Sequence, residues 1–171
     1  MHLSAIEEDM SATTDAPADG LHPATVTAWA RLLRASQALL GAVEADLKAA
    51  GFPPLAWYDV LLELRRAGEG GLRPLALQRA MLLAQYNLSR LLDRMEREGL
   101  VARRPCPDDA RGQLVVATCE GLALQERMWP VYREAIRTHF AARLDSASAE
   151  VLARLLGKLL ESETGRAKPA G

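Results

Sequence analysis

Apolar residues recur along most of this chain with the period of an α-helix. From Trp29 to Leu47 they return at steps of three and four residues, which predicts an amphipathic helix that stops before Gly51. A second helical pattern lies between Pro53 and Gly68, with prolines leading in and closely spaced glycines ending it. The N-terminal part therefore predicts two helices joined by a short loop.

The C-terminal part is predicted to be helical as well. One helix should run over about 120–144 and kink at Pro130, because proline removes a hydrogen bond inside a helix. A serine-rich break at 145–148 can cap the last helix, which carries a wide apolar seam over Leu152–Leu160. The preceding helix adds three bulky apolar residues, namely Tyr132, Ile136 and Phe140.

Two short helices are predicted in the middle of the chain, around a tight turn at 82–84. The first covers about 75–81, and the second covers 84–98 and ends at Gly99. One face of the second helix is apolar, with Leu88, Leu91, Leu92 and Met95. Another face carries Arg90, Arg94 and Arg97. Two short helices of which the second is basic on its exposed side indicate a helix-turn-helix.

Directly after this pair, the pattern predicts two short strands. They cover about 100–105 and 112–118, around a tip rich in proline, aspartate and glycine. A helix-turn-helix followed at once by a two-stranded hairpin is a winged helix-turn-helix. The predicted fold is therefore mainly α, with about six helices and a two-stranded β wing.

Charge is distributed unevenly along the chain. The net charge of the 171 residues is −1, yet eight arginines and only five acids fall between Arg73 and Gly112, so this segment is +3 and the remainder −4. Arginine suits forked contacts to phosphates and to guanine edges. The alternative is a solvated helical face held by pairs within the helix, such as Asp93–Arg97.

The predicted hairpin tip holds Arg111 beside Gly112, which permits a tight turn. An arginine at such a tip can enter the narrow, negative minor groove while the second helix enters the major groove. Asp109 could hold the tip by pairing with Arg111 or with another wing arginine. An ordinary solvated turn is the alternative for both residues.

The hairpin residues resemble the wing signature of the MarR family of bacterial winged-helix transcriptional regulators, Asp-x-Arg-x-x-x-Val-x-Leu-Thr-x-x-Gly. The matching residues are Asp109, Arg111, Val115, Ala117 in place of the usual leucine, Thr118 and Gly121. Upstream, LSRLLDRMEREGLVARRPCPDD is similar to the family's recognition helix running into the wing. The resemblance spans about 25–160, with further departures, among them Tyr86 and Asn87 at positions that are commonly small. Ala84 stands where Ser or Thr usually opens the recognition helix, and Ala110 stands where a second wing arginine is common.

The resemblance implies a sequence-specific DNA-binding transcriptional regulator, by default a repressor, acting on a palindromic double-stranded operator. The candidates for base contacts are Gln85, Tyr86, Asn87 and Arg90. The candidates for phosphate contacts are Arg94, Arg73 and Arg104. In the wing, Arg111 is expected to reach the minor groove and Asp109 to brace it. Loss of a base contact should change sequence preference, whereas loss of a phosphate contact should weaken binding to all sequences.

The family also implies one domain over 23–162 that forms a homodimer. Its winged helix-turn-helix core is expected over about 52–121, with dimerisation helices over about 23–50 and 120–162. The apolar seam of the last helix exceeds what a small DNA-binding module needs for its own core. Packing of the seam on the first helix of the same chain is the alternative.

In the family, effectors that are often aromatic acids tend to bind between the dimer helices and the winged lobe. Flat aromatic walls with an arginine suit a small aromatic carboxylate. The residues that could line such a site here are Trp29, Arg31, Arg34, Ser36, Trp57 and Tyr58. Plain core packing is the alternative for each tryptophan.

Other classes of function find less support in the sequence. His2, His22 and His139 are scattered, and we find no nucleophile triad and no phosphate-binding glycine loop, so no enzyme, metal or cofactor is expected. Cys106 and Cys119 leave a thiol-based redox-sensing regulator as an alternative, although oxidant-sensing members generally use a cysteine in the first helix, which this chain lacks. A helical protein-interaction module without DNA binding is a further alternative.

A cytoplasmic chain without a membrane segment is expected. No apolar run is long enough to span a bilayer, and no lysine or arginine precedes Arg31, unlike in a signal peptide. Residues 1–22 are expected to form a disordered acidic arm and residues 163–171 a frayed tail.

Overall fold

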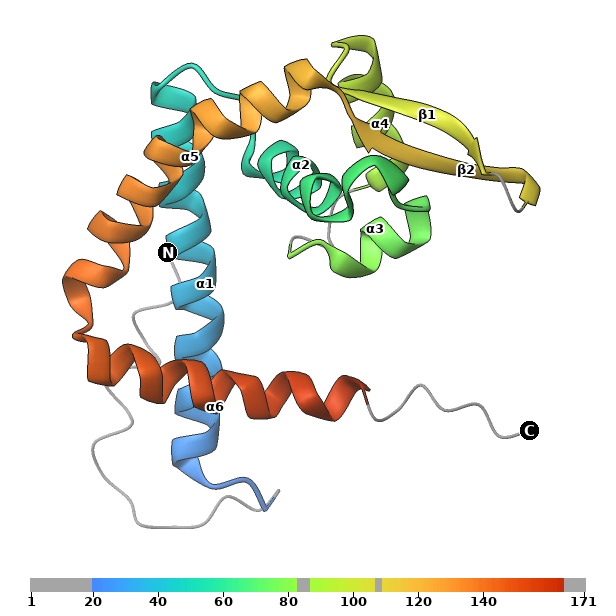
Figure 1. The fold of residues 1–171 in the computed structure, drawn as a ribbon. Helices are drawn as coiled ribbons and strands as arrows, with labels where there is room; N and C mark the ends of the chain where they lie inside the picture. The colour runs from blue at the N-terminus through green and yellow to red at the C-terminus, as the bar shows by residue number, and fades with distance from the viewer. Residues whose placement is uncertain (1–19, 83–86, 107–108, 165–171) are drawn as a thin grey trace, which may run out of the picture. The chain divides into compact units, whose positions relative to one another are not determined.

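The structure is a computed structural model that describes residues 20–82, 87–106 and 109–164 (Figure 1). In chain order its elements are α1 (Pro23–Ala49), α2 (Leu55–Ala67), the 3-10 helix η3 (Gly68–Gly70), α3 (Pro74–Ala80), α4 (Leu88–Arg97), β1 (Val101–Cys106), β2 (Asp109–Ala117), α5 (Cys119–His139), the 3-10 helix η4 (Ala141–Arg143) and α6 (Ser146–Thr164). The chain divides into two compact units, one up to Leu39 and one from Leu40 onward. The predicted mainly α fold with a two-stranded wing is confirmed.

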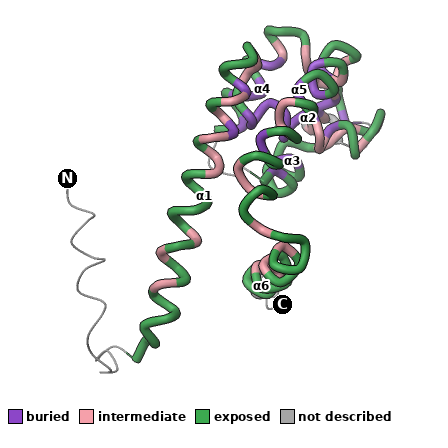
Figure 2. Tube along the Cα trace, turned by 90° about the vertical axis from the view of Figure 1, so that its left-hand side faces the viewer, coloured by how far each residue is buried: buried purple, intermediate pink, exposed green. Residues whose placement is uncertain are grey.

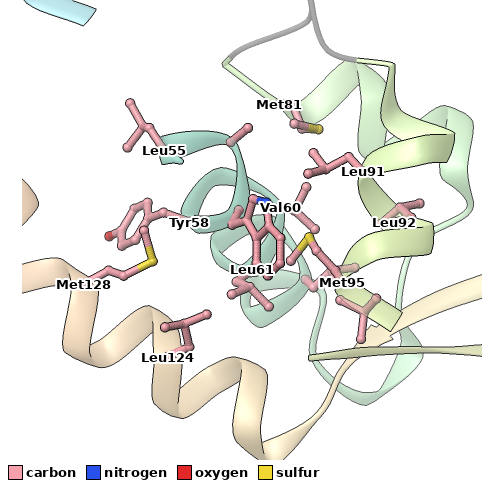
Figure 3. Packing of buried hydrophobic residues seen from close by; sticks show 14 of the residues in the cluster. Leu55, Tyr58, Val60, Leu61, Met81, Leu91, Leu92, Met95, Leu124 and Met128 are labelled. Carbon is pink, nitrogen blue, oxygen red and sulfur yellow. The ribbon is translucent and has the colours of Figure 1, made fainter. Parts of the chain in front are cut away.

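The core of the larger unit is built around α2. All residues from Leu55 to Leu61 are buried, so the first two turns of α2 are covered on every side rather than on one stripe. Leu92 and Met95 of α4, and Leu124 and Met128 of α5, join it in one cluster of buried side chains (Figure 3). Burying a side chain of this size contributes about 1.5–3 kcal/mol. Figure 2 shows that buried positions gather in α2, α4 and α5, whereas α6 is largely exposed.

β1 and β2 form an antiparallel hairpin, as predicted. Its register runs from Val101 opposite Ala117 to Pro105 opposite Gln113, and the pairing becomes irregular after Pro105. β2 begins at Asp109, three residues before the predicted start. The hairpin lies next to α4, which precedes it directly in the chain (Figure 1).

A segment before α3 joins the base of this hairpin. Leu72 and Val115 form an isolated antiparallel bridge, in which each amide donates to the other's carbonyl at 2.9 and 2.8 Å. Gly71 precedes the bridge with a φ of 62°, and a Cβ at this residue would lie 2.4 Å from the Val115 carbonyl oxygen. Only glycine combines this backbone conformation with so close an approach. The bridge ties the helix-turn-helix to the wing.

α5 begins at a junction with the chain that follows α4. The Thr118 hydroxyl accepts a hydrogen bond from the Gly121 amide at 3.0 Å and donates one to the Gly99 carbonyl at 2.7 Å. One side chain therefore caps α5 and holds its start against the chain that follows α4. Two residues of the wing signature, Thr118 and Gly121, thus have a structural role here.

The C-terminal helices differ from the sequence pattern in their bounds. α5 ends at His139 rather than near residue 144, and η4 separates it from α6. Pro130 lies inside α5, which changes direction along its length (Figure 1). The Asp145 carboxylate accepts a hydrogen bond from the Ser148 amide at 2.7 Å, which confirms the predicted cap and lowers the pKa of Asp145. Among the helices that the structure describes, none has the length and apolar character needed to span a bilayer.

The apolar seam predicted on α6 is exposed in the single chain. Its exposed large side chains are Val151, Leu155, Leu159 and Leu160, and Ile136 of α5 is exposed as well. Tyr132 was predicted to belong to the seam, but it packs against the core instead. Its ring lies edge-on to that of Tyr58 with centroids 5.1 Å apart, and burial raises the pKa of both phenols.

Candidate nucleic-acid interface

α4 has two chemically different faces, as the pattern predicted. Its buried residues are Leu88, Leu91, Leu92 and Met95. Its exposed residues are Ser89, Arg90, Asp93, Arg94 and Arg97. The apolar face fixes the helix on the core (Figure 3), so the arginines of the other face are presented from a rigid element rather than from a loop.

α4 begins later than predicted. Asn87 has extended backbone angles, with φ −70° and ψ 92°, and its side-chain oxygen accepts a hydrogen bond from the Arg90 amide at 3.3 Å. The predicted start at Ala84 is therefore wrong, because Asn87 is the N-cap and supplies the partner that a first-turn amide lacks. Asn87 is a predicted base contact, and its side-chain oxygen is engaged in this cap. Gln85 and Tyr86, the neighbouring candidates, lie outside the described residues.

Arg94, a predicted phosphate contact, is held against the core of the domain. Its guanidinium carbon lies 5.7 Å from the centre of the Trp57 ring, within the range of a cation–π contact. Trp57 belongs to α2 and is only 6% exposed. The contact restricts the long Arg94 side chain on the exposed side of α4, so less conformational entropy is lost when it meets an anion.

The acids of α4 are paired with the wing. Arg103 of β1 places one guanidinium nitrogen 2.5 Å from Asp93 and the other against Glu96. The pKa of Arg103 is raised, first by the Asp93 hydrogen bond, so it stays charged. The alternative pairing of Asp93 with Arg97 is not what the structure shows, since Arg97 donates to the backbone carbonyl of Asp93 instead.

Sequence reasoning missed Arg103, because its partners are brought to it by the fold. Asp93 and Glu96 lie 10 and 7 residues before it, beyond the range of a helical pair. The only local signal is strand alternation, which turns adjacent side chains to opposite faces. Arg103 pairs across the hairpin with the buried Val115, whereas the next residue, Arg104, is exposed.

The remaining arginine candidates lie around the wing. Arg73 immediately precedes α3, and its guanidinium donates a hydrogen bond to the Cys106 sulfur at 3.4 Å. Arg104, a predicted phosphate contact, is exposed on β1. Asp109 and Arg111 have their backbone in β2, and their side chains lie outside the described part. The predicted roles of Asp109 and Arg111 stay predictions.

The residues predicted to bind an effector fall into two groups. Trp57 and Tyr58 are buried in the core of the larger unit, at 6% and 5% exposure. The others, on α1 in the N-terminal unit, are exposed: Trp29, Arg31, Arg34 and Ser36. The Ser36 hydroxyl donates to the Leu33 carbonyl of its own helix.

Both cysteines are free thiols, with Cys106 buried and Cys119 exposed. Within the described segments, no three His, Cys, Asp or Glu side chains are grouped to hold a metal ion.

Comparison with known proteins identifies the family. A sequence model of the MarR family matches residues 50–112, the segment that holds α2, α3, α4 and most of the hairpin. The multiple antibiotic resistance protein MarR of Escherichia coli K12 is 30% identical over 105 residues, which cover 61% of this chain and 72% of that protein. The chain belongs to the MarR family of transcriptional regulators.

Solved structures of the family share the fold. A MarR family transcriptional regulator from Streptomyces coelicolor, Sco3205, solved in complex with DNA, has a TM-score of 0.76 and 25% identity, covering 88% of this chain and 95% of that one. BpsR of Bordetella bronchiseptica, whose DNA binding is regulated by 6-hydroxynicotinic acid, has a TM-score of 0.66 and 26% identity, covering 75% of this chain and 89% of that one. This MarR-family chain therefore resembles regulators studied with DNA and with a small aromatic acid.

Proposed function

We propose that this chain is a transcriptional repressor that binds a palindromic operator as a homodimer. The observation that carries the proposal is the architecture of α4, whose apolar face is fixed on the core and whose exposed face presents Arg90, Arg94 and Arg97. A helix held in this way fits the major groove, and the adjoining hairpin fits the minor groove beside it.

The exposed apolar side chains support the homodimer. Leu155, Leu159 and Leu160 of α6 are at least half exposed in the single chain, as is Trp29 of α1. Such residues on terminal helices suit an interface between two copies. A twofold axis through that interface carries two recognition helices into successive major grooves, roughly 34 Å apart.

Selection from a random library of DNA duplexes tests the proposal. The full-length protein should enrich a palindrome whose half-site centres lie about 10 base pairs apart, or a multiple of one helical turn. An enriched single half-site would contradict the homodimer, and no enrichment would contradict sequence-specific binding.

We further propose that a small aromatic carboxylate releases the repressor from its operator. The likeness to BpsR and its regulation by 6-hydroxynicotinic acid support this class of effector. Of the residues chosen from the sequence, those exposed on α1 support this effector class, since Arg31 and Arg34 offer the charge that a carboxylate needs.

A panel of aromatic acids should identify the effector by thermal shift. A hit should raise the unfolding temperature of the protein and weaken its binding to the selected duplex. The matching aromatic amide, which lacks the negative charge, serves as the control. A ligand that stabilises the protein without changing DNA affinity would argue against release, and equal effects of acid and amide would argue against a carboxylate site.

A further inference from the structure

The exposed side of α4 carries acids as well as arginines. Asp93 and Glu96 are three residues apart and lie on neighbouring positions of the helix, and their side chains are 55% and 38% exposed. Two free carboxylates at this place would repel the phosphates that Arg90, Arg94 and Arg97 are proposed to meet. Repulsion of this kind opposes association over the whole surface and not only at one contact.

Arg103 engages both carboxylates at once. Its two terminal nitrogens reach Asp93 and Glu96 separately, which is the forked geometry that a planar guanidinium provides. Its own side chain is only 24% exposed, because it lies against α4 at the base of the wing. Arg104, its neighbour in β1, is exposed. Two adjacent arginines of one strand therefore have different surroundings.

We propose that Arg103 is a positioning residue for DNA binding, which acts by holding the negative charge of Asp93 and Glu96 away from the phosphates and does not itself contact DNA. The inference rests on the proposed function, since it concerns the surface of α4 that faces the duplex. The wing arginines then have two roles. Arg103 pairs with the acids of α4, whereas others, such as Arg104, contact the DNA.

Neutralising variants distinguish this role from direct contact. The probe is a fluorescently labelled duplex of mixed sequence, and binding is followed by anisotropy over a range of salt concentrations. Arg103→Gln should weaken binding about 10-fold, because it leaves two carboxylates unpaired near the phosphates. Adding Asp93→Asn and Glu96→Gln to this variant should restore the affinity of the parent protein. If the triple variant stays as weak as Arg103→Gln and its salt slope is shallower by about 0.9, Arg103 contacts a phosphate and the proposal is wrong.

Arg104→Gln is the matched control, with the same substitution at the next residue of the strand. Arg104→Gln should weaken binding and make the salt dependence of the affinity shallower. Adding Asp93→Asn and Glu96→Gln to it should not restore the salt dependence of the parent protein. Arg103→Lys should retain most of the affinity of the parent, since it keeps the charge. Unfolding temperatures measured for every variant separate loss of binding from loss of fold.

Two further outcomes would overturn the inference. If Asp93→Asn/Glu96→Gln alone weakens binding as much as Arg103→Gln, the ion pairs act by fixing the shape of the wing and not by cancelling charge. If the parent protein binds no duplex, the proposed function fails, and the inference fails with it. The parent is measured first, so the two failures are distinguished.

Discussion

Gly121→Ala is expected to destabilise the protein by about 3 kcal/mol or more, the upper range for overpacking a tight site. Gly121 lies in the first turn of α5, where a Cβ would stand 2.1 Å from the Leu100 carbonyl oxygen and 2.9 Å from the Leu61 side chain. The same Leu100 carbonyl accepts a hydrogen bond from the amide of Thr118 at 3.1 Å. Because Thr118 is the N-cap of α5, a shift of this carbonyl would loosen the cap. The new methyl therefore has to displace backbone.

The measurement is the free energy of unfolding in urea at one fixed protein concentration. Gly70→Ala is the matched control, because Gly70 lies in η3, outside the proposed dimer interface, and a Cβ there meets nothing within 4 Å. Replacing glycine by alanine at such a position stabilises a protein by about 0.4–1 kcal/mol because it lowers the entropy of the unfolded chain, so the control should be as stable as the parent or more stable. Equal stability of the two variants would show that α5 does not pack on the Leu100 backbone as described.

Arg90→Glu is expected to weaken binding to the selected operator about 100-fold, because it removes a proposed DNA contact and adds a charge that repels phosphate. The fold should be unaffected or slightly stabilised. Arg90 is exposed and lies in the first turn of α4, where a negative side chain suits the helix dipole and the Asn87 cap stays in place. Loss of affinity with retained stability is the diagnostic combination.

The affinity is measured with the operator obtained by selection, and the unfolding temperature is measured in parallel. Arg133→Glu is the control, since it makes the same change of charge at an exposed position of α5. The control should lower affinity only slightly, through the net charge of the protein. Similar losses in both variants would mean that α4 is not the element that meets DNA.

The sequence was sufficient to predict those structural features that depend on residues close together in the chain. Apolar residues at helical spacing predicted the faces of α4, and the serine-rich break at 145–148 predicted a cap for α6, which Asp145 supplies. The start of α4 was misplaced because the apolar pattern continues before Asn87, while the cap depends on one side-chain hydrogen bond. A local side-chain cap thus set the boundary, which periodicity alone does not fix.

The candidate site was predictable in composition but not in pairing. The excess of arginine between Arg73 and Gly112 marked the right segment of the chain. Three contacts join residues from different elements. They are the ion pairs of Arg103 with Asp93 and Glu96, the cation–π contact of Arg94 with Trp57, and the β-bridge between Leu72 and Val115. Such contacts form only after α2, α4 and the hairpin have packed together, so no pattern along the sequence carries them.

The central claim is that an arginine-rich surface of this MarR-family chain binds operator DNA. The salt dependence of the parent protein's affinity for the selected duplex tests it most directly. The logarithm of the affinity should fall linearly with the logarithm of the salt concentration, with a slope of about −4 or steeper, as counterions are released from several phosphates. A scrambled duplex should bind more weakly at every salt concentration. A slope near zero, or equal affinity for the selected and scrambled duplexes, would contradict the account.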